Sequence, residues 1–465
     1  MTRLFLPAVL ALVSGCAVGP DYVGPTSDAP AAFAEQGPWK IATPRDSVPR
    51  GQWWKIFRDP ALDGLEADAA AASPTLKAAL ARYDAAAAFA RVSRAALLPT
   101  AGIDASARRE RFSGNRESEL QSSVIGYTAD SFDLRLDLTY EVDLFGQARR
   151  SLESARAAAD AEGATYRNVL LTLEAGVARN YFTLRSLRAQ KELLARNVDL
   201  LSDTLDLVRK LRAGGANSDL DLYQTEAQLE IVQSAALAVD QAIAEQLHAL
   251  AVLVGRVPEG FTVEPPPGEP ETPAVPVGLP SDLLERRPDI ATAERTMAAA
   301  NARIGVAKAA FFPSVSLTAF AGANSADLST LLKWSSREWA VGPLISLPLF
   351  SGGATLANFR QSQALYQASV AGYRQQVLAA FQEVEDGLSD LRYLSAQADV
   401  LARASEASRQ ATSLSTVRYK AGLVSYLEVI DAERTQLQAE LSLTQVRAQR
   451  LTATVLLIKA VGGGW

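Results

Sequence analysis

Few side chains in this 465-residue chain could carry out chemistry, because it has a single histidine, His248, and a single cysteine, Cys16. One histidine is too few for a zinc site that needs two, and it leaves most nucleophiles without a base. Gly352 and Gly353 are not followed by the Lys-Ser/Thr of a phosphate-binding loop. The acids are abundant, but none stand out as an acid/base couple. We therefore predict a non-enzyme without cofactor or metal.

Glu428 and Asp431 are the acids whose spacing allows them to act together. They are three residues apart and share one face of a predicted helix, just after a turn at Ala421–Val424. By spacing alone, the favoured interpretation is that they solvate the helix or interact with its positive N-terminus. A ring of such acids around an axis would instead attract cations and resist anions. Such a ring closes only if basic groups or water offset the repulsion.

The N-terminus predicts export and lipid attachment. Arg3 is followed by an apolar core over 4–13 and by the small residues Ser14 and Gly15 before Cys16. The segment 12–16 resembles a bacterial lipoprotein box, and a signal peptide with an incidental cysteine is the alternative. We expect a signal peptide over 1–15, with covalent diacylglycerol and an acyl chain on Cys16, since two or more chains anchor a protein firmly. Ala17, rather than aspartate, implies sorting to the outer membrane.

Composition excludes two broad classes. With 48% hydrophobic and 21% charged residues the chain is that of a folded protein. Its net charge of -6 argues against a nucleic-acid binder, which needs a basic face. After the first segment there is no uninterrupted run of about 18 apolar residues, so we predict no transmembrane helix in the mature chain.

The chain is internally duplicated. Four segments recur in the same order: 73–76 at 287–290, 94–100 at 308–314, 143–146 at 348–351, and Gly215, Ser218, Asp221 and Glu226 at Gly422, Ser425, Glu428 and Glu433. Between the copies, Pro258 to Pro280 holds eight of the 22 prolines and predicts an extended connector. We therefore divide the chain into an N-terminal arm (16–61), repeat 1 (62–257), a connector (258–281) and repeat 2 (282–465).

Each repeat follows one predicted plan: a helix (about 62–96 and 282–310), two strands (about 100–144 and 314–349) and a long helical hairpin. Phe132 to Leu144 alternates apolar and polar residues, which predicts a strand about 40 Å long with one apolar face. A membrane barrel explains this charged alternation more directly than the edge of a soluble sandwich does. The four strands of one chain are too few to close a barrel, and an open strand edge is untenable in lipid. Several copies of the chain must therefore share one barrel.

The helical hairpins are predicted from the absence of proline between Gly146 and Val257 and after Leu349, together with apolar residues repeating every seven positions. Turns are expected at 213–217 and 421–424, with Ser218 and Ser425 as N-caps. Arms of about 65 residues would reach about 100 Å.

The whole chain resembles the TolC/NodT-type outer membrane factor lipoproteins, the outer-membrane channels of RND-type tripartite efflux systems. The residues that carry this resemblance are Cys16 with 19–22, Trp53 and Trp54, 141–146, 284–290 and 309–313. The resemblance implies a mostly α protomer of a trimeric 12-stranded outer-membrane β-barrel, continued by a long periplasmic α-helical barrel. The arm and the connector would form an equatorial region. A periplasmic membrane-fusion adaptor and an inner-membrane RND-type transporter would be its partners.

The resemblance also implies that Glu428 and Asp431 line a periplasmic gate. The candidate basic partners are Arg418, Lys420, Arg209 and Arg212. Repeat 1 has Asp221 but Gln224 at the matching positions, so only repeat 2 has both acids. The expected function is passive export of small molecules, drugs or metal ions. A duct for secreted polypeptides and a periplasmic coiled-coil adaptor are the alternatives.

Overall fold

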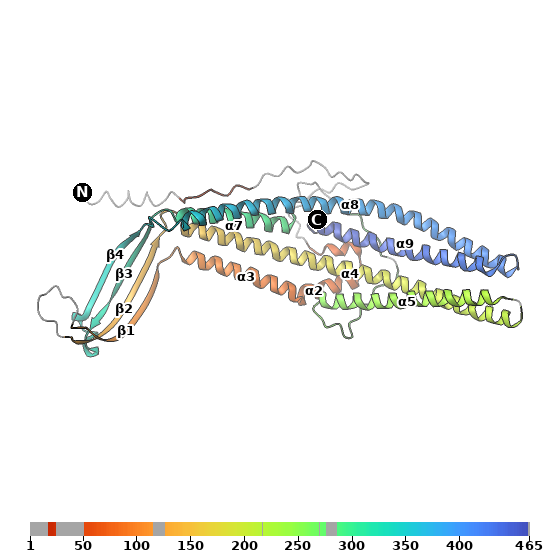
Figure 1. Cartoon of the computed structure of the whole chain (residues 1–465), viewed down its shortest axis with the longest axis horizontal. Helices are drawn as coiled ribbons and strands as arrows, with labels where there is room; N and C mark the ends of the chain where they lie inside the picture. Colours follow the sequence, from red (N-terminus) through yellow and green to blue (C-terminus); the bar gives the residue numbers. More distant parts are fainter. Residues whose placement is uncertain are drawn as a thin grey trace. The chain divides into compact units, whose positions relative to one another are not determined.

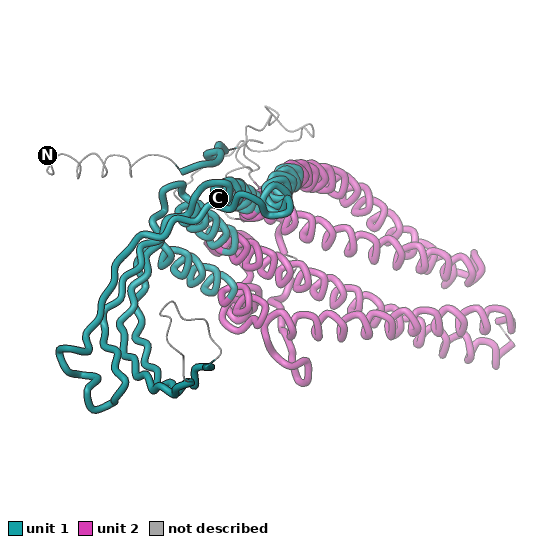
Figure 2. The backbone as a smooth tube through the Cα atoms, turned by 60° about the vertical axis from the view of Figure 1, so that its left-hand side comes forward, with its two compact units in different colours: residues 1–25, 82–162, 293–373 teal, residues 26–81, 163–292, 374–465 magenta. Residues whose placement is uncertain are grey.

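The structure is a computed structural model that describes residues 17–24, 51–114, 126–215, 217–268, 270–275 and 286–463. The predicted signal peptide and Cys16 lie outside the described residues, as does the end of the connector. The chain forms two compact units, shown in Figure 2: unit 1 comprises 1–25, 82–162 and 293–373, and unit 2 the remainder. Each unit therefore contains segments from both predicted repeats.

Unit 1 contains one antiparallel sheet with strand order β1-β2-β3-β4 (Figure 1). Its strands are β1 (Thr100–Arg111), β2 (Thr128–Val142), β3 (Ser314–Ser325) and β4 (Arg337–Ser346). The β2–β3 pairing joins the two repeats. Strand β2 ends two residues before Leu144, because the Asp143 carboxylate accepts the backbone N–H groups of Ala148 and Arg149. Asp143 thus caps the start of the following helix instead of extending the strand.

The sheet has one apolar and one charged face, as the alternation predicts. The register places Ile103, Leu136, Ala321 and Trp339 side by side on one face. On the opposite face Arg135 binds Glu338, with 2.8 Å between Nε and Oε1. Because paired residues in a sheet share a face, one side is suited to lipid and the other to water.

The helices have matching lengths in the two repeats. Helices α3 (Pro74–Ala95) and α7 (Pro288–Ala309) have 22 residues each, α4 (Gln147–Ala213) and α8 (Ala354–Lys420) have 67, and α5 (Asp219–Leu253) and α9 (Tyr426–Ala460) have 35. Each hairpin therefore has arms of 67 and 35 residues. The longer arm spans about 100 Å at 1.5 Å per residue.

One predicted helix is in fact two. The expected helix over 62–96 is split into α2 (Pro60–Ala72) and α3, and Ser73 between them has φ -53° and ψ 120°. Proline disfavours the helical conformation in the residue before it, so Pro74 ends α2 as it begins α3. At the other end of α2, the Asp59 carboxylate accepts the N–H groups of Ala61 and Leu62.

Two glycines close the returning helices of the two repeats in the same way. Gly255 after α5 and Gly462 after α9 have φ of +70° and +90°. A Cβ on Gly255 would lie 2.8 Å from the Ala72 carbonyl oxygen, and one on Gly462 would lie 2.9 Å from that of Arg286. Both positions need glycine for its conformation and for space. The duplication therefore extends to the packing of the helix ends.

Unit 2 contains two apolar clusters. The larger one packs the short 3-10 helix η1 (Trp53–Phe57) against α4, with the Phe57 and Phe182 ring centroids 4.7 Å apart. The second cluster joins the two hairpins near their turns. Its buried side chains come from α4, α5 and α9 and include Val208, Leu222 and Ile430. The hairpin turns are therefore held against each other by apolar packing.

Candidate functional site: the hairpin turns

The turn of the second hairpin is built around Gly422. Gly422 has φ +71°, and its N–H donates to the Tyr419 carbonyl at 2.9 Å while the Leu423 N–H donates to Arg418 at 3.0 Å. These two bonds form a Schellman motif, which ends α8 and turns the chain into α9. Ser425 occupies the N-cap position, as expected, but its side chain makes no capping hydrogen bond, so the predicted cap is wrong in that respect.

Glu428 lies in the first turn of α9 and is exposed, with 44% of its side chain accessible. Its Oε1 accepts a hydrogen bond from Nη1 of Arg418 at 2.9 Å. Arg418 is one of the basic partners expected from the sequence. An exposed pair of this kind contributes about 0–1 kcal/mol to stability, so this ion pair can open and close at little cost.

Asp431, one turn further along α9, is 63% exposed and has a partner that the sequence analysis missed. Its Oδ1 is 2.6 Å from Nη2 of Arg434. The i, i+3 spacing of the two residues could have indicated this pair. Lys420, another expected partner, makes no ion pair in the part of the chain that the structure describes. Both acids are thus held by arginines of their own hairpin.

Arg209 and Arg212, the other two possible gate partners, contact acids of the first hairpin in the single chain, and their place at the gate stays a prediction. Arg209 lies 3.7 Å from Glu226, and Arg212 binds Asp219. Both acids belong to α5, the return arm of the same hairpin. In the single chain these two arginines are therefore paired within their own hairpin.

The first hairpin turn uses its acid to cap a helix. The Asp221 carboxylate accepts the Ser218 N–H at 3.2 Å and its hydroxyl at 2.8 Å, while Ser218 Oγ accepts the Asp221 N–H at 3.2 Å. This capping box satisfies two backbone donors that the helix itself leaves unpaired. Asp221 is therefore committed to its own helix end, whereas Glu428 at the matching position is not.

Glu433 is a further acid near the second turn that sequence reasoning did not single out as functional. Burial raises the pKa of Glu433 to about 7, and its Oε2 has no hydrogen-bond partner among the described residues. Two features could have indicated Glu433: it matches Glu226 in repeat 1, and it lies among buried apolar residues of α9. Near neutral pH this carboxyl is present in both protonation states.

Arg287, in the segment 284–290 that carries the resemblance, is buried, and its contacts in unit 2 join parts of three helices. Its guanidinium donates to Asp289 at 3.0 and 2.6 Å and to the Ala460 carbonyl at 2.9 Å, and it lies 2.7 Å from Glu383. Burial alone would raise the pKa of Asp289, but the hydrogen bonds and charge of Arg287 lower it below its usual value. This motif is structural: it ties the start of α7 to α8 and to the end of α9.

The segment just after Cys16 is fixed to unit 1. The Val18 N–H donates to the Phe145 carbonyl at 3.0 Å, Asn301 donates to the Pro20 carbonyl at 3.1 Å, and Arg150 binds Asp21 at 2.5 Å. Phe145 follows β2 by three residues. Residues 18–21 are therefore held next to the junction between the sheet and the long helices.

Comparison with known proteins gives consistent matches over the full length. ArpC, an antibiotic efflux pump outer membrane protein of Pseudomonas putida, is 32% identical over 99% of this chain and 95% of its own. OpmQ, a pyoverdine export outer membrane protein of Pseudomonas aeruginosa, is 33% identical over 98% and 97%. The solved outer-membrane channel OprN has a TM-score of 0.89 at 33% identity, covering 97% of this chain and all of that one.

The chain also matches the family described as outer membrane efflux protein, over residues 65–256 and 279–463. These matches confirm the predicted resemblance and the fold class of a duplicated, mostly helical protomer of an outer-membrane β-barrel continued by a helical barrel. They also confirm the outer-membrane location and favour an outer-membrane channel over the coiled-coil adaptor, the alternative from a different class. The chain belongs to the outer membrane efflux protein family and is an outer-membrane efflux channel that extends into the periplasm.

Proposed function

We propose that three copies of the chain form the exit duct of a tripartite efflux pump, working with a periplasmic membrane-fusion adaptor and an inner-membrane RND-type transporter. The observation that carries the shared duct is the sheet of unit 1. Its strands β1 and β4 pair on one side only among the described residues. In lipid an unpaired strand edge has no water to satisfy it, so both edges must pair with other copies. Four strands from each of three copies give the twelve-stranded barrel.

The helices support the same assembly. Of the described helices only α5 is long and apolar enough to cross a membrane, yet it is the return arm of a hairpin. Its exposed apolar side chains include Leu220, Ile231 and Leu237, which are 63–70% accessible in the single chain. A soluble monomer rarely leaves such a surface uncovered. Neighbouring copies in a helical barrel would bury it.

The matching helix lengths support the proposed repeats, 62–257 and 282–465.

The proposed cargo is small molecules, since related channels are named for antibiotic, toluene and pyoverdine efflux. The duct would be passive and carry out no catalytic step. We also propose that Cys16 carries the lipid. The contacts that fix residues 18–21 next to the end of β2, a strand of the proposed barrel, support this.

Glu428 and Asp431 are the proposed gate. Two carboxylates per copy would place six around the axis of a trimer, where a ring of acids favours cations and repels its own members. Arg418 and Arg434 offset part of this charge. Removing the acids should loosen the closed tip and reduce its preference for cations.

The test is single-channel conductance of purified trimers in planar bilayers. Glu428→Ala combined with Asp431→Ala should enlarge the conductance and lower cation selectivity. Asp219→Ala is the matched control, since it removes an exposed acid from the first turn of the other hairpin and should change neither property. Unchanged conductance of the double variant, with trimers intact by size, would refute the gate. Monomers of the native chain in size analysis would refute the shared duct.

A further inference from the structure

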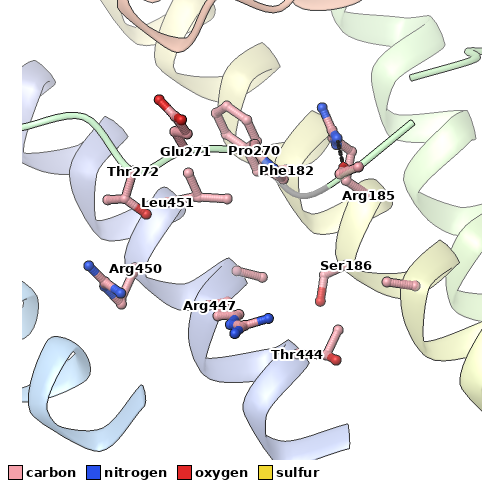
Figure 3. A pocket seen from close by; sticks show the side chains of 13 residues that line it. Phe182, Arg185, Ser186, Pro270, Glu271, Thr272, Thr444, Arg447, Arg450 and Leu451 are labelled. Carbon is pink, nitrogen blue, oxygen red and sulfur yellow. Dashed lines mark hydrogen bonds between the residues drawn. The ribbon is translucent and has the colours of Figure 1, made fainter. Parts of the chain in front are cut away.

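A cavity of about 520 Å³ in unit 2 is lined by side chains of α4, of the connector and of α9 (Figure 3). Arg185 and Arg447 both line it. Arg185 binds the Asp59 carboxylate and donates to the carbonyl groups of Pro266 and Gly268. Its guanidinium therefore ties the connector to α4 and to the residue before α2, which is a structural task.

Another cavity, of about 440 Å³, lies in unit 1 on the apolar face of the sheet, and we call it the rim cavity. Residues 326–336, the connection between β3 and β4, cover part of it. The lining from the sheet includes Ile103, Leu134, Leu136, Ala321 and Ala323, and the lining from the connection and the start of β4 is Leu331, Leu332, Lys333 and Arg337. The register places these sheet residues on one face. The volume is within the range of small-molecule sites, about 300–1,000 Å³.

The connection that covers the rim cavity is held in place by its own side chains. Thr330 contacts both of its ends: Thr330 Oγ1 lies 2.6 Å from Ser325 Oγ, and the Thr330 carbonyl accepts the Ser336 hydroxyl at 2.8 Å. Leu331 is buried between the short 3-10 helices η2 (Leu328–Thr330) and η3 (Trp334–Ser336). The rim cavity is therefore a feature of the fold.

The rim cavity lies at the exterior end of the sheet. At their other ends, β2 and β4 lead into α4 and α8, and the channel extends into the periplasm with these helices. The connection 326–336 is therefore on the opposite side of the membrane. Leu332, Trp334 and Trp339 are 75–80% exposed in the single chain. Apolar and aromatic side chains on this face are suited to contact with the outer leaflet.

Arg337 brings a positive charge to this lipid-facing surface. It pairs with Ala323 in the register, and its Cζ lies 3.7 Å from the centre of the Trp334 ring. Stacking on a ring leaves the N–H donors at the edge of a guanidinium open. Neither Arg337 nor Lys333 makes an ion pair within the described ranges. A cation beside hydrocarbon needs acceptors, and at this end of the sheet lipid headgroups supply them.

The other charged groups next to the rim cavity do not meet this need in the described part of the chain. Arg135 is paired with Glu338 and Asp133 on the opposite face of the sheet. Asp327, the acid of the connection, is exposed and forms no ion pair with either cation among the described residues. A phosphate at the membrane surface would accept hydrogen bonds from both cations.

We propose that the rim cavity binds lipid A, the phosphorylated lipid of the outer leaflet. Arg337 and Lys333 would hold its phosphates, and one acyl chain would lie along Leu134 and Leu331. Two neighbouring cations match a lipid that carries two phosphates. The binding surface is on the lipid side of the sheet, so it is separate from the hairpin turns and independent of the gate.

The test is native mass spectrometry of the purified full-length channel in a neutral detergent, with diphosphoryl lipid A or phosphatidylcholine added at equal concentration. Diphosphoryl lipid A should bind at least about tenfold more tightly than phosphatidylcholine. Lys333→Gln with Arg337→Gln should remove this preference. Arg108→Gln is the matched control and should leave it intact, since Arg108 is an exposed cation on the opposite face of the same sheet.

A second variant fills the rim cavity without removing charge. Ala321→Trp places a ring on its floor while both cations remain, and it should weaken lipid A binding by about tenfold or more. Ala101→Trp, on the same face but outside the lining, is the control and should not weaken binding. Both alanines are exposed, so neither change disturbs a packed core.

Four results would overturn the proposal. The native channel may fail to retain lipid A, or phosphatidylcholine or phosphatidylglycerol, which has one phosphate, may bind it as tightly. The folded Ala321→Trp variant may bind lipid A as tightly as the native channel. Glu117 and Glu119, between β1 and β2, lie outside the described residues. If lipid A binds only after Glu117→Gln with Glu119→Gln, these acids rather than a lipid hold the two cations.

Discussion

Glu66 in α2 is a fully buried carboxyl, and its replacement by glutamine should change how stability depends on pH. Neither of its Oε atoms has a hydrogen-bond partner among the described residues. Burial, and then the nearby charges of Glu174 and Asp63, raise the pKa of Glu66 to about 10. Burial also raises the pKa of Glu174 to about 7, opposed by a hydrogen bond from the Trp53 indole. Glu66 is therefore neutral in the folded channel at neutral pH.

The sign and size of the effect follow from proton linkage. The pKa of Glu66 is higher in the folded state, about 10, than its ordinary value of 4.5. The neutral Glu66 carboxyl makes its full contribution to the stability of the folded state below pH 4.5. This contribution decreases by about 1.4 kcal/mol per pH unit as the pH rises towards 10. Between pH 5.5 and 7.5 the native chain should lose about 2.7 kcal/mol from this group alone. The Glu66→Gln variant should not lose this stability, because its amide does not ionise.

The assay is urea unfolding at pH 5.5 and 7.5, followed by helical circular dichroism. The stability of Glu66→Gln relative to the native chain should rise by about 2.7 kcal/mol between the two pH values. Any fixed cost of fitting the amide cancels in this comparison. Glu245→Gln, an exposed change on α5, is the control and should show no such rise. The interpretation of Glu66 as a buried neutral carboxyl would be refuted if the free energies of unfolding of Glu66→Gln and the native chain differed by the same amount at both pH values.

Two further predictions concern packing in unit 2. Gly255→Ala should cost about 1–3 kcal/mol, because φ is +70° and the added Cβ would lie 2.8 Å from the Ala72 carbonyl. Thermal unfolding would show the loss, whereas Gly64→Ala, with open space around it, should not be destabilised. Arg287→Gln should cost about 3–5 kcal/mol, because it leaves the half-buried Asp289 carboxylate without its charge partner. A denaturation midpoint within error of the native value would contradict that role.

The sheet and the hairpins could be predicted from the sequence because each depends on a long, regular pattern. The alternation over Phe132 to Leu144 lies within or next to β2, and the proline-free segments became α4 and α8. Patterns over many residues average out local exceptions. The glycine turns were predicted for the same reason, since both repeats have one at the matching position.

The missed features depend on one residue or on contacts between distant segments. The break at Ser73 was hidden by an alanine-rich helix pattern on both sides of Pro74. The choice of Arg434 over more distant arginines is set by the local spacing on α9. The burial of Glu66 and the gathering of Arg447 with Arg185 require the packed fold, because nothing in the local sequence distinguishes these residues from exposed ones.

The two hairpin turns differ at one matched position by a single methylene group. The Asp221 carboxylate accepts the N–H of Ser218, whereas the Glu428 carboxylate accepts a hydrogen bond from Arg418. After the duplication, two matched acids thus make different contacts: one closes its own helix end, and the other pairs with the opposite arm of its hairpin. The two copies therefore perform different local tasks at one matched position while their returning helices keep the same length of 35 residues.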